Sequence, residues 1–412
     1  MKILKLSSYC YPEQVASSHL SKDMNEAYEK SGIICEVYAP TPCRGIDEQT
    51  RKKYKKIKYE EINNGHIRIH RYSMFKEPKN PVLRAFRYTL CILRGFICGL
   101  FAKDIDIFSS SSTPPINGLV MYALKKVKKY KTVYSLQDIF PDSLVNAKMT
   151  KKGSVLWKIG RFVENITYKS ADRIIVISED FKRNIMEKGV SEDKIDVVYN
   201  WVNEQKVVNI DREDNKLFDK YNLERDKFYI CYSGNIGLSQ NMEILTDVAK
   251  ELEKNEDIRF VIIGEGAFKE SLLSIIEEKQ VKNITVLPFQ DYEDISHVFS
   301  LGDAGLIISK KGIGSNSVPS KTWSIMSASR PVIASFDKGS EFDSIITENN
   351  CGICVEADDK EALIKAVLYM YENKDEIKKM GENGRRFILE NLTKEIGTGK
   401  SISVLRKVYS QK

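Results

Sequence analysis

Two short motifs in the second half of the chain carry residue types that suit the binding of an anion. Gly234-Asn-Ile-Gly237 follows an apolar run and precedes a helix-like segment that starts near Glu243. Glycine permits positive φ angles and a close approach of the backbone to a phosphate. Pro319-Ser320-Lys321 opens another helix-like segment, where free N–H groups favour an anion, Ser320 is placed to cap and Lys321 adds a full positive charge. Both motifs predict phosphate contacts; an ordinary turn and an ordinary helix start are the alternatives.

The first half carries fewer such residues. Glu13, Ser17, Ser18 and His19 follow the first strand-like run, and the small serines stand where a helix begins. We expect this segment to contact a phosphate or a second substrate. Asp138 ends another strand-like run and is placed to hold or deprotonate a substrate hydroxyl. A helix surface for His19 and a turn cap for Asp138 are the alternatives for these two residues.

Strand-like and helix-like segments alternate along the chain, and this alternation sets the fold class. It predicts an α/β protein with parallel sheets covered on both faces. The length of 412 residues suits two domains, and the polar stretch 201–226 is typical of a linker. We therefore predict two Rossmann-like domains, residues 1–200 and 201–393, that face a cleft where ligands bind at the carboxyl ends of the strands. Residues 41–66 are predicted to form a long basic loop.

The charge of the chain is unevenly distributed. Residues 1–200 hold an excess of Lys and Arg, whereas the remainder holds an excess of Asp and Glu. A lysine run at 125–131 and a lysine-flanked helix with Trp157 and Phe162 predict peripheral contact with an anionic membrane surface. Nucleic acid is not expected as a partner, because no recognition motif is present. A solvated charged face is the alternative.

Neither a secretory leader nor a transmembrane helix is expected. The chain opens on a strand-like run, and its eight cysteines are scattered, which favours reduced thiols in the cytoplasm. Cys351-Gly-Ile-Cys354 is predicted to be a turn entering a strand, since a structural zinc site needs four ligands. The apolar segment 88–102 is interrupted by Arg94, so we expect it to lie on a membrane surface or inside the domain.

Several motifs in the second half, taken in order, resemble the family-4 glycosyltransferases of the GT-B fold. A looser match in the first half resembles the branch that builds bacterial O-antigens and capsules, which includes N-acetyl-fucosamine transferases. The motifs of the second half are Ala171-Asp-Arg-Ile-Ile-Val-Ile-Ser178-Glu179, Val197-Val-Tyr-Asn200-Trp-Val-Asn203, Tyr232-Ser-Gly234-Asn235-Ile-Gly237, Ile262-Ile-Gly264-Glu-Gly266, Leu287-Pro-Phe289, Gly302-Asp303-Ala-Gly-Leu306, Val318-Pro319-Ser320-Lys321, Arg330-Pro331-Val-Ile-Ala334 and Asn350-Cys-Gly352. The looser matches are Tyr11-Pro12-Glu13, Ser112-Thr-Pro114-Pro115 and Asp138-Ile-Phe-Pro141-Asp142-Ser143.

The resemblance implies that the second domain binds a nucleotide-diphosphate sugar and that residues 394–412 form a helix returning to the first domain. It also implies retaining transfer, in which the departing phosphate takes the acceptor proton and no enzymic nucleophile is needed. We assign catalytic roles to Asp138 and Lys321. Donor contacts are expected from Gly234, Asn235, Gly237, Gln240, Glu265, Phe289, Asn316, Pro319, Ser320, Lys321 and Ser324.

The chain departs from the family where the donor is held. Many relatives carry Arg and Lys, both on the donor diphosphate, where this chain has Asn235 and Gln240. Two glutamates of the family map onto Asn316 and Ser324, and the second of them normally accepts hydrogen bonds from the nucleotide ribose. The usual cations and carboxylates of the donor site are therefore missing.

Two explanations compete for these departures. In one, Lys321 together with Lys310 or Lys311 replaces the lost positive charge; in the other, the chain no longer binds a donor. The retained Pro-Ser-Lys and Gly-Asn-Ile-Gly motifs favour the first.

We therefore predict a hexosyltransferase-type enzyme in the cytoplasm, peripheral to the inner face of the cell membrane. It would move an N-acetylated deoxyhexose or a hexose from a nucleotide-diphosphate donor to a polyprenyl-diphosphate-linked glycan, in O-antigen or capsule biosynthesis. No cofactor and no metal are expected: Asp104-Ile-Asp106 spells the metal-binding DxD of the other major glycosyltransferase fold, but it starts a strand with no loop to present it. The alternatives are a nucleotide-sugar epimerase on the same fold and a protein without donor binding that acts as an assembly partner.

Overall fold

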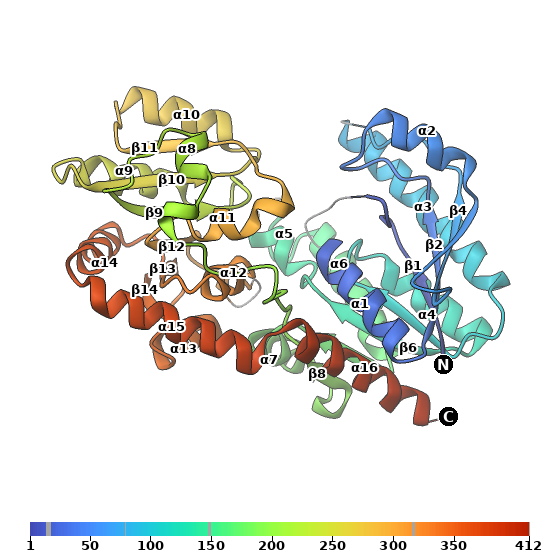
Figure 1. The fold of residues 1–412 in the computed structure, drawn as a ribbon. Helices are drawn as coiled ribbons and strands as arrows, with labels where there is room; N and C mark the ends of the chain where they lie inside the picture. Colours follow the sequence, from blue (N-terminus) through green and yellow to red (C-terminus); the bar gives the residue numbers. More distant parts are fainter. Residues whose placement is uncertain (14–17, 79, 147–149, 315–317, 412) are drawn as a thin grey trace. The chain divides into compact units, whose positions relative to one another are not determined.

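The computed structural model describes residues 1–13, 18–78, 80–146, 150–314 and 318–411, which form two compact units (Figure 1). Unit 1 comprises Met1–Tyr199 and Gly397–Lys412, and unit 2 comprises Asn200–Ile396. Each unit contains a sheet of parallel strands with helices packed on it, apart from one antiparallel strand in unit 1. The predicted α/β class with two Rossmann-like domains is confirmed.

Unit 1 is built on an eight-stranded sheet with the order β3-β4-β2-β1-β5-β6-β7-β8. Alternate residues of its central strands, such as Ile3, Val37 and Ile107, are buried against α1 and α16. The opposite face, with Leu6 and Phe108, packs under α3 and α4. The elements are β1 (Lys2–Leu6), α1 (Ser18–Lys30), β2 (Ile34–Pro40), α2 (Glu48–Lys56), β3 (Tyr59–Ile62), β4 (Ile67–Tyr72), α3 (Pro81–Phe101), β5 (Ile107–Ser111), α4 (Asn117–Lys128), β6 (Lys131–Leu136), α5 (Asp142–Asn146), α6 (Val155–Ser170), β7 (Arg173–Val176), α7 (Glu179–Glu187) and β8 (Ile195–Val197).

The prediction of a long loop over residues 41–66 is wrong, because this segment contains α2 and β3. Asp47 caps α2 by accepting a hydrogen bond from the Thr50 N–H at 2.7 Å, and Tyr54 is buried on the inner side of the helix. β3 then pairs antiparallel with β4 across a turn in which Gly65 has a φ of +82°. The abundance of lysine on the exposed side of α2 hid its amphipathic pattern.

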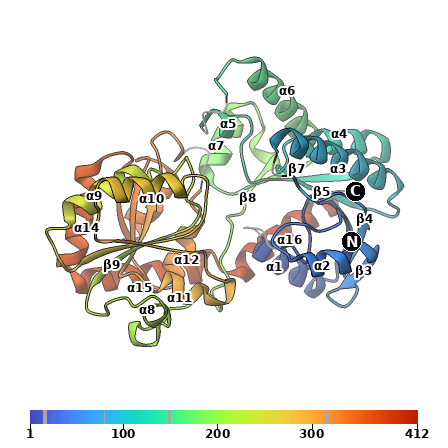
Figure 2. The same cartoon turned by 90° about the horizontal axis from the view of Figure 1, so that it is seen from above.

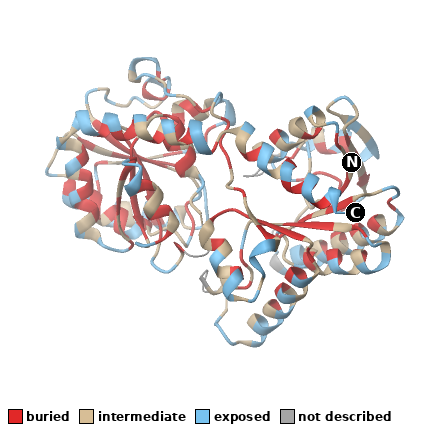
Figure 3. Ribbon diagram, turned by 90° about the horizontal axis from the view of Figure 1, so that it is seen from below, coloured by how far each residue is buried: buried red, intermediate tan, exposed pale blue. Residues whose placement is uncertain are grey.

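Unit 2 is built on a six-stranded parallel sheet with the order β11-β10-β9-β12-β13-β14 (Figure 1). One face packs against α9, α10 and α14, and the other against α8 and α11. The strands are buried while the outer sides of the helices are exposed (Figure 3). The elements are α8 (Leu217–Lys220), β9 (Phe228–Ser233), α9 (Met242–Leu252), β10 (Ile258–Ile263), α10 (Lys269–Glu278), β11 (Ile284–Leu287), α11 (Ile295–Phe299), β12 (Ala304–Ile308), α12 (Lys321–Ser327), β13 (Val332–Phe336), α13 (Glu341–Glu348), β14 (Gly352–Glu356), α14 (Lys360–Glu372) and α15 (Lys374–Asn391).

The stretch 201–226, predicted to be a linker, belongs to unit 2. Phe218 is buried with Tyr229 and Val261 of the sheet. The backbone N–H groups of Val208 and Ile210 donate to the hydroxyls of Ser296 and Ser300 at 3.1 and 2.9 Å. The polar composition of this stretch reflects hydrogen bonds made to the unit, which sequence alone does not distinguish from solvent exposure.

The last helix, α16 (Lys394–Ser410), starts in unit 2 and passes into unit 1 at Gly397. Its Ile402, Leu405 and Val408 are buried together with Ile33 and Val37 of unit 1. Among the described residues, no helix is both long enough and apolar enough to cross a bilayer.

Candidate functional site

The donor motifs lie where the order of the strands in unit 2 reverses direction. From β9 the chain runs outward through β10 and β11, then returns to β12 beside β9 and continues outward through β13 and β14. The segments after β9 and β12 therefore diverge at the carboxyl end of the sheet, which is where ligands bind in open α/β folds. Gly234-Asn-Ile-Gly237 follows β9, and Lys310 and Lys321 follow β12.

The glycines of the loops after β9 and β10 let two backbones touch. A Cβ on Gly264 would lie 1.8 Å from the carbonyl oxygen of Gly234, and one on Gly266 would lie 2.1 Å from that of Ile236. The loops are joined by hydrogen bonds from the Ile236 N–H to the Glu265 carbonyl and from the Phe268 N–H back to the Ile236 carbonyl, both 2.9 Å. The two glycine motifs thus form one rigid platform.

We expect Gly264→Ala to break this platform. Its methyl group would meet backbone rather than a flexible side chain, so the loop must shift, and we expect a loss of unfolding free energy on the order of 2 kcal/mol or more together with weaker nucleotide binding. Urea unfolding measures the first and calorimetry the second. Gly399→Ala is the control, because a Cβ there meets nothing within 4 Å in α16. Equal stability of the two variants would contradict the view that the two glycine loops form one rigid platform.

Lys321 is the first residue of α12 and its side chain reaches the β9 loop. A Cβ on Gly234 would lie 1.5 Å from Nζ of Lys321, so the ammonium group lies directly against the backbone of Gly234. Nζ lies 5.5 Å from the centre of the Tyr232 ring, a cation–π distance. Tyr232 in turn donates its hydroxyl hydrogen to the Asn235 carbonyl at 2.7 Å. Sequence reasoning missed Tyr232; its only signal is an aromatic residue two positions before the glycine.

The residue Lys321 is half-buried, its ammonium group is largely enclosed by protein atoms, and this cation has no counter-ion. None of the carboxylates that the structure describes lies within ion-pair distance of it, and burial lowers its pKa from 10.5 to about 8. By contrast, Lys311 pairs with Glu356 at 2.9 Å and Lys338 with Asp343 at 2.8 Å. An unpaired buried charge is costly unless a ligand of opposite charge neutralises it.

We expect Lys321→Met to stabilise the ligand-free protein at pH 7. The folded-state pKa lies below the unfolded value, so folding disfavours the protonated form; this cost is full below about pH 8 and disappears above pH 10.5. The gain is at most about 3 kcal/mol at pH 7. Urea unfolding at pH 7 measures it, with Lys338→Met as the control that loses an ion pair. A less stable Lys321→Met variant would contradict the view that the charge is uncompensated.

Asn235 and Gln240 stand where relatives carry cations, and Lys310 and Lys311 are the candidates to replace that charge. Gln240 accepts a hydrogen bond from the Gly237 N–H at 3.1 Å, so its side chain holds the loop. The Asn235 residue is exposed. The Lys310 N–H donates to the Ser239 carbonyl at 2.9 Å, which places Lys310 beside the same loop, whereas Lys311 is occupied by Glu356. Of the two lysines considered as replacements, Lys310 is the better placed.

Two other predicted donor residues, Glu265 and Phe289, lie near the platform. Glu265 lies in the platform, is exposed and pairs with Lys269 at 2.6 Å. Phe289 follows β11 with 71% of its surface exposed, and the preceding Leu287 carbonyl accepts the Gly264 N–H at 3.2 Å. These aromatic and carboxylate groups flank the glycine loops.

The Pro-Ser-Lys motif forms the start of α12, but it does so without the predicted cap. Ser320 is exposed and its hydroxyl makes no capping hydrogen bond, because residues 318–320 already turn through backbone bonds; the Pro319 carbonyl accepts the Thr322 N–H at 2.9 Å. Ser324 is half-buried in α12. Asn316 lies outside the described residues. The charge of Lys321, rather than the end of this seven-residue helix, is what the motif brings to the site.

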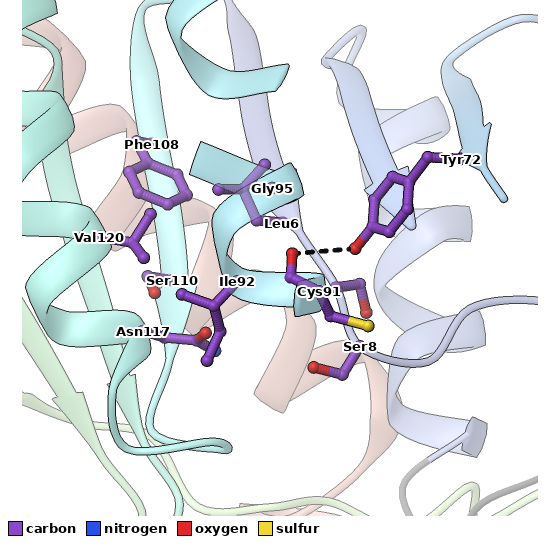
Figure 4. Close-up of a pocket in the computed structure, with 11 residues that line it drawn as sticks. Leu6, Ser8, Tyr72, Cys91, Ile92, Gly95, Phe108, Ser110, Asn117 and Val120 are labelled. Carbon is purple, nitrogen blue, oxygen red and sulfur yellow. Dashed lines mark hydrogen bonds between the residues drawn. The ribbon is translucent and has the colours of Figure 1, made fainter. Parts of the chain in front are cut away.

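The strand order of unit 1 reverses between β1 and β5, and a recess lies there (Figure 4). It is small, ≈ 20 Å³, room for about one water molecule. Its lining residues come from the ends of β1 and β5 and from α3 and α4: Leu6, Ser8, Cys91, Gly95, Phe108, Ser110, Asn117 and Val120 among them. The hydroxyl of Tyr72 donates to the Cys91 carbonyl at 3.2 Å at its edge.

Asp138 follows β6, next to this reversal. The buried Ser112 hydroxyl, which follows β5, accepts the N–H groups of Gln137 and Asp138 at 3.0 and 3.1 Å and so fixes the loop. The residue is exposed overall, yet protein atoms crowd its carboxyl group and raise its pKa, while a hydrogen bond with the Thr113 side chain opposes that rise. Sequence reasoning missed Ser112, whose signal was only its place in the Ser/Thr/Pro loop.

Glu13 has a structural task that its sequence position did not reveal. It is 6% exposed; one carboxylate oxygen accepts the N–H groups of Cys43 and Arg44 at 2.8 and 3.0 Å, and the other accepts that of Cys10 at 3.0 Å. We therefore correct its assignment to acceptor or phosphate contact: the carboxylate joins the loops after β1 and β2. Ser18 donates to the Glu13 carbonyl at 3.2 Å.

The remaining candidates are placed as follows. His19 is half-buried in α1, and Ser17 lies outside the described residues. Asp106 precedes β5 and accepts the Lys2 N–H at 2.8 Å, which gives the Asp104-Ile-Asp106 sequence a structural role. Within the described ranges no group of three or more His, Cys, Asp or Glu side chains could hold a metal ion. All eight cysteines are free; Cys351 directly precedes β14, and Cys354 lies within this strand.

Comparisons with known proteins agree with this architecture. Residues 22–206 match the family described as Glycosyltransferase Family 4, and residues 213–387 match Glycosyl transferases group 1. The first match covers most of unit 1 and reaches into the start of unit 2, and the second lies within unit 2. The chain is a glycosyltransferase of the GT-B fold.

Relatives of this glycosyltransferase are moderately similar in sequence. The probable glycosyltransferase WbjE of Pseudomonas aeruginosa is 27% identical over 75% of this chain and 76% of its own length. The putative colanic acid biosynthesis glycosyl transferase WcaI of Escherichia coli strain K12 is 25% identical over 60% of this chain and 61% of its own length.

Solved structures share the fold of the glycosyltransferase. Sucrose-phosphate synthase from Thermosynechococcus elongatus superposes with a TM-score of 0.78 at 14% identity and full coverage of both chains. Anabaena HepE in complex with UDP superposes with a TM-score of 0.74 at 14% identity, covering 99% of this chain and all of its own.

Proposed function

We propose that this glycosyltransferase takes a sugar from a nucleotide-diphosphate donor bound at the carboxyl end of the unit 2 sheet. The observation that carries the proposal is the unpaired ammonium of Lys321 against the backbone of Gly234. The diphosphate supplies the negative charge that this buried cation lacks, and it gains charge as the sugar departs. A preorganised cation then stabilises the leaving group more strongly than the bound donor.

The neighbours of Lys321 suit the rest of the donor. The glycine platform lets backbone approach the phosphates closely, and Lys310 lies beside the same loop. The structural neighbour HepE was solved with UDP, which supports a nucleotide as a ligand of this fold. We infer that Lys321 and Lys310 supply the charge of the cations that relatives carry at the positions of Asn235 and Gln240. An N-acetylated deoxyhexose or a hexose is the proposed sugar.

We further propose that transfer is retaining and that the acceptor is a growing glycan on polyprenyl diphosphate at the inner face of the cell membrane. Asp138 is the group we assign to the acceptor hydroxyl, and the departing phosphate takes its proton. The name of WcaI, which refers to colanic acid biosynthesis, supports a role in bacterial surface polysaccharide or lipopolysaccharide assembly, including O-antigen or capsule. No cofactor or metal enters this scheme.

Calorimetric titration of the purified protein with UDP and with GDP tests the donor site. Binding of either nucleotide supports the proposal, and turnover with the matching nucleotide sugars and lipid-linked acceptors then identifies the reaction. Conversion of the donor without any acceptor would instead indicate a nucleotide-sugar epimerase.

Two observations favour the second candidate, a protein that binds no donor. The Gln240 side chain is occupied by a hydrogen bond from the Gly237 N–H, and Ser324 offers one hydroxyl where relatives have a carboxylate. If neither nucleotide binds at millimolar concentration, the donor-site proposal fails and the assembly-partner function replaces it.

A further inference from the structure

The outward face of α3 in unit 1 is apolar along its whole length. Phe86, Leu93, Ile97 and Phe101 are all more than half exposed, and Phe101 exposes 77% of its surface. Their spacing places them on one side of a helix of 21 residues, about 30 Å long. A helix on the surface of a water-soluble domain normally turns polar residues outward. This helix therefore presents the kind of face that marks an interaction site.

The neighbouring helix α6 repeats the pattern. Val155, Ile159 and Phe162 follow the i, i+4, i+7 spacing and expose 75%, 56% and 64% of their surfaces. The inner side of α6 is held by other residues; Gly160 packs on Pro141, and Thr167 fills the space above Gly118 of α4. The packing of α6 in unit 1 therefore does not require apolar residues on its outward side.

The two apolar faces belong to one surface. α4 packs against both α3 and α6, so the three helices lie side by side (Figure 2). Val127 of α4 is 63% exposed between them. Gly99 of α3 sits directly on Leu124 of α4, which keeps these two helices close.

The charge of the side chains on and next to this surface is mainly positive. The three helices contain nine Lys and Arg, three on each, of which Arg87 is buried and Arg84, Lys125 and Arg161 pair with Glu77, Asp172 and Glu164. Seven exposed lysines on these helices and on the segments next to them have no carboxylate within ion-pair distance in the described structure: Lys103, Lys126, Lys129, Lys151, Lys152, Lys158 and Lys169. A surface that is apolar at its centre and basic around it complements an anionic lipid headgroup layer over acyl chains.

We propose that the outward faces of α3, α4 and α6 form a docking surface for an anionic lipid bilayer. The phenyl and aliphatic side chains enter the boundary between headgroups and acyl chains, and the lysines contact the lipid phosphates. The surface uses none of the donor residues, so it stands whether or not the nucleotide proposal holds. Arg94 is exposed on the same helix, and its guanidinium donates a hydrogen bond to the Ser73 carbonyl.

Vesicle flotation with the full chain tests this surface. We expect the protein to float with vesicles of mixed phosphatidylcholine and phosphatidylglycerol and to stay behind with phosphatidylcholine alone. The combined variant Lys126→Gln, Lys151→Gln, Lys152→Gln, Lys158→Gln should lower the affinity at least tenfold and flatten its salt dependence. The variant Phe86→Ser, Ile97→Ser, Phe162→Ser should lower it at least tenfold at every salt concentration.

A matched control is offered by α2 of the same unit. Lys52→Gln, Lys53→Gln, Lys55→Gln, Lys56→Gln removes the same charge from exposed lysines away from α3, α4 and α6, and should bind vesicles as the wild type does. Circular dichroism and thermal unfolding check that each variant is folded. Wild type that does not float, or equal loss in the α2 control, would overturn the proposal. So would a wild-type dimer in lipid-free solution that the serine variant dissociates, because the surface would then join two copies of the chain.

Discussion

Lys321→Ala is expected to weaken binding of UDP or GDP by about 10- to 100-fold at pH 7. No described carboxylate neutralises the enclosed ammonium group of this side chain. The ammonium group lies directly against the backbone of Gly234 in the donor motif. A hydrogen bond between a charged group and its ligand contributes roughly 1.5–3 kcal/mol, which corresponds to this range. Isothermal titration with each nucleotide measures the change.

Two features separate this result from a general loss of structure. Lys360→Ala removes another lysine of unit 2, one that pairs with Glu251 on the protein surface at 2.9 Å, and it should leave nucleotide affinity unchanged. The alanine variant of Lys321 should also unfold at a higher urea concentration than the wild type, since it loses an uncompensated charge. Undiminished nucleotide binding by Lys321→Ala would show that other groups hold the diphosphate, although the transferase class would stand.

The affinity of the wild type should depend on pH in a direction that Lys321 fixes. The ligand-free ammonium has a pKa of about 8, and a bound diphosphate favours the protonated form. Below about pH 8 the site is already charged, so affinity is constant with respect to this group. Between pH 7 and pH 9 it should fall by about tenfold as the free site loses its proton. Lys321→Ala should lack this dependence.

The sequence pattern identified most strands because buried parallel strands are short apolar runs between turns. β9 and β12, for example, are the apolar runs Phe228–Ser233 and Ala304–Ile308. The sequence pattern missed elements that contain few apolar residues. The buried residues of α2 are only Arg51 and Tyr54. The main sequence signal of α13 is Ser340, whose hydroxyl caps the helix by accepting the Asp343 N–H at 3.3 Å.

The candidate site was predictable at its glycines and at Lys321, for different reasons. Glycines after a strand are conspicuous in sequence, and the structure explains them through contacts between loops that are distant along the chain, such as Gly264 on Gly234. The lack of a counter-ion at Lys321 depends on which carboxylates fold nearby, so no motif could reveal it. Glu13 shows the converse: its place before a helix suggested a ligand contact, whereas its carboxylate accepts two backbone N–H groups from a distant loop and one from its own loop.

Asp138→Asn is expected to lower the rate of sugar transfer by roughly 100-fold or more while leaving UDP or GDP affinity unchanged. The amide keeps the shape of the side chain and leaves the hydrogen bonds from the backbone to Ser112 intact, but it lacks the negative charge with which the carboxylate holds the acceptor hydroxyl. Release of nucleotide from a panel of UDP- and GDP-sugars, with polyprenyl-diphosphate-linked sugars as acceptors, measures the rate.

The pH profile distinguishes a catalytic role of Asp138 from a structural one. Crowding raises the pKa of this carboxyl, so its ionised form, and with it kcat/KM of the wild type, should decline on acidification at a higher pH than an ordinary aspartate would allow. Asp138→Asn should lose this acidic limb. Asp104→Asn is the matched control: it makes the same exchange at an exposed position before β5, at the opposite end of the strands, and should transfer sugar at the wild-type rate. If Asp138→Asn retains both the rate and the acidic limb, the carboxyl only shapes the loop after β6, and the acceptor hydroxyl is held by other residues.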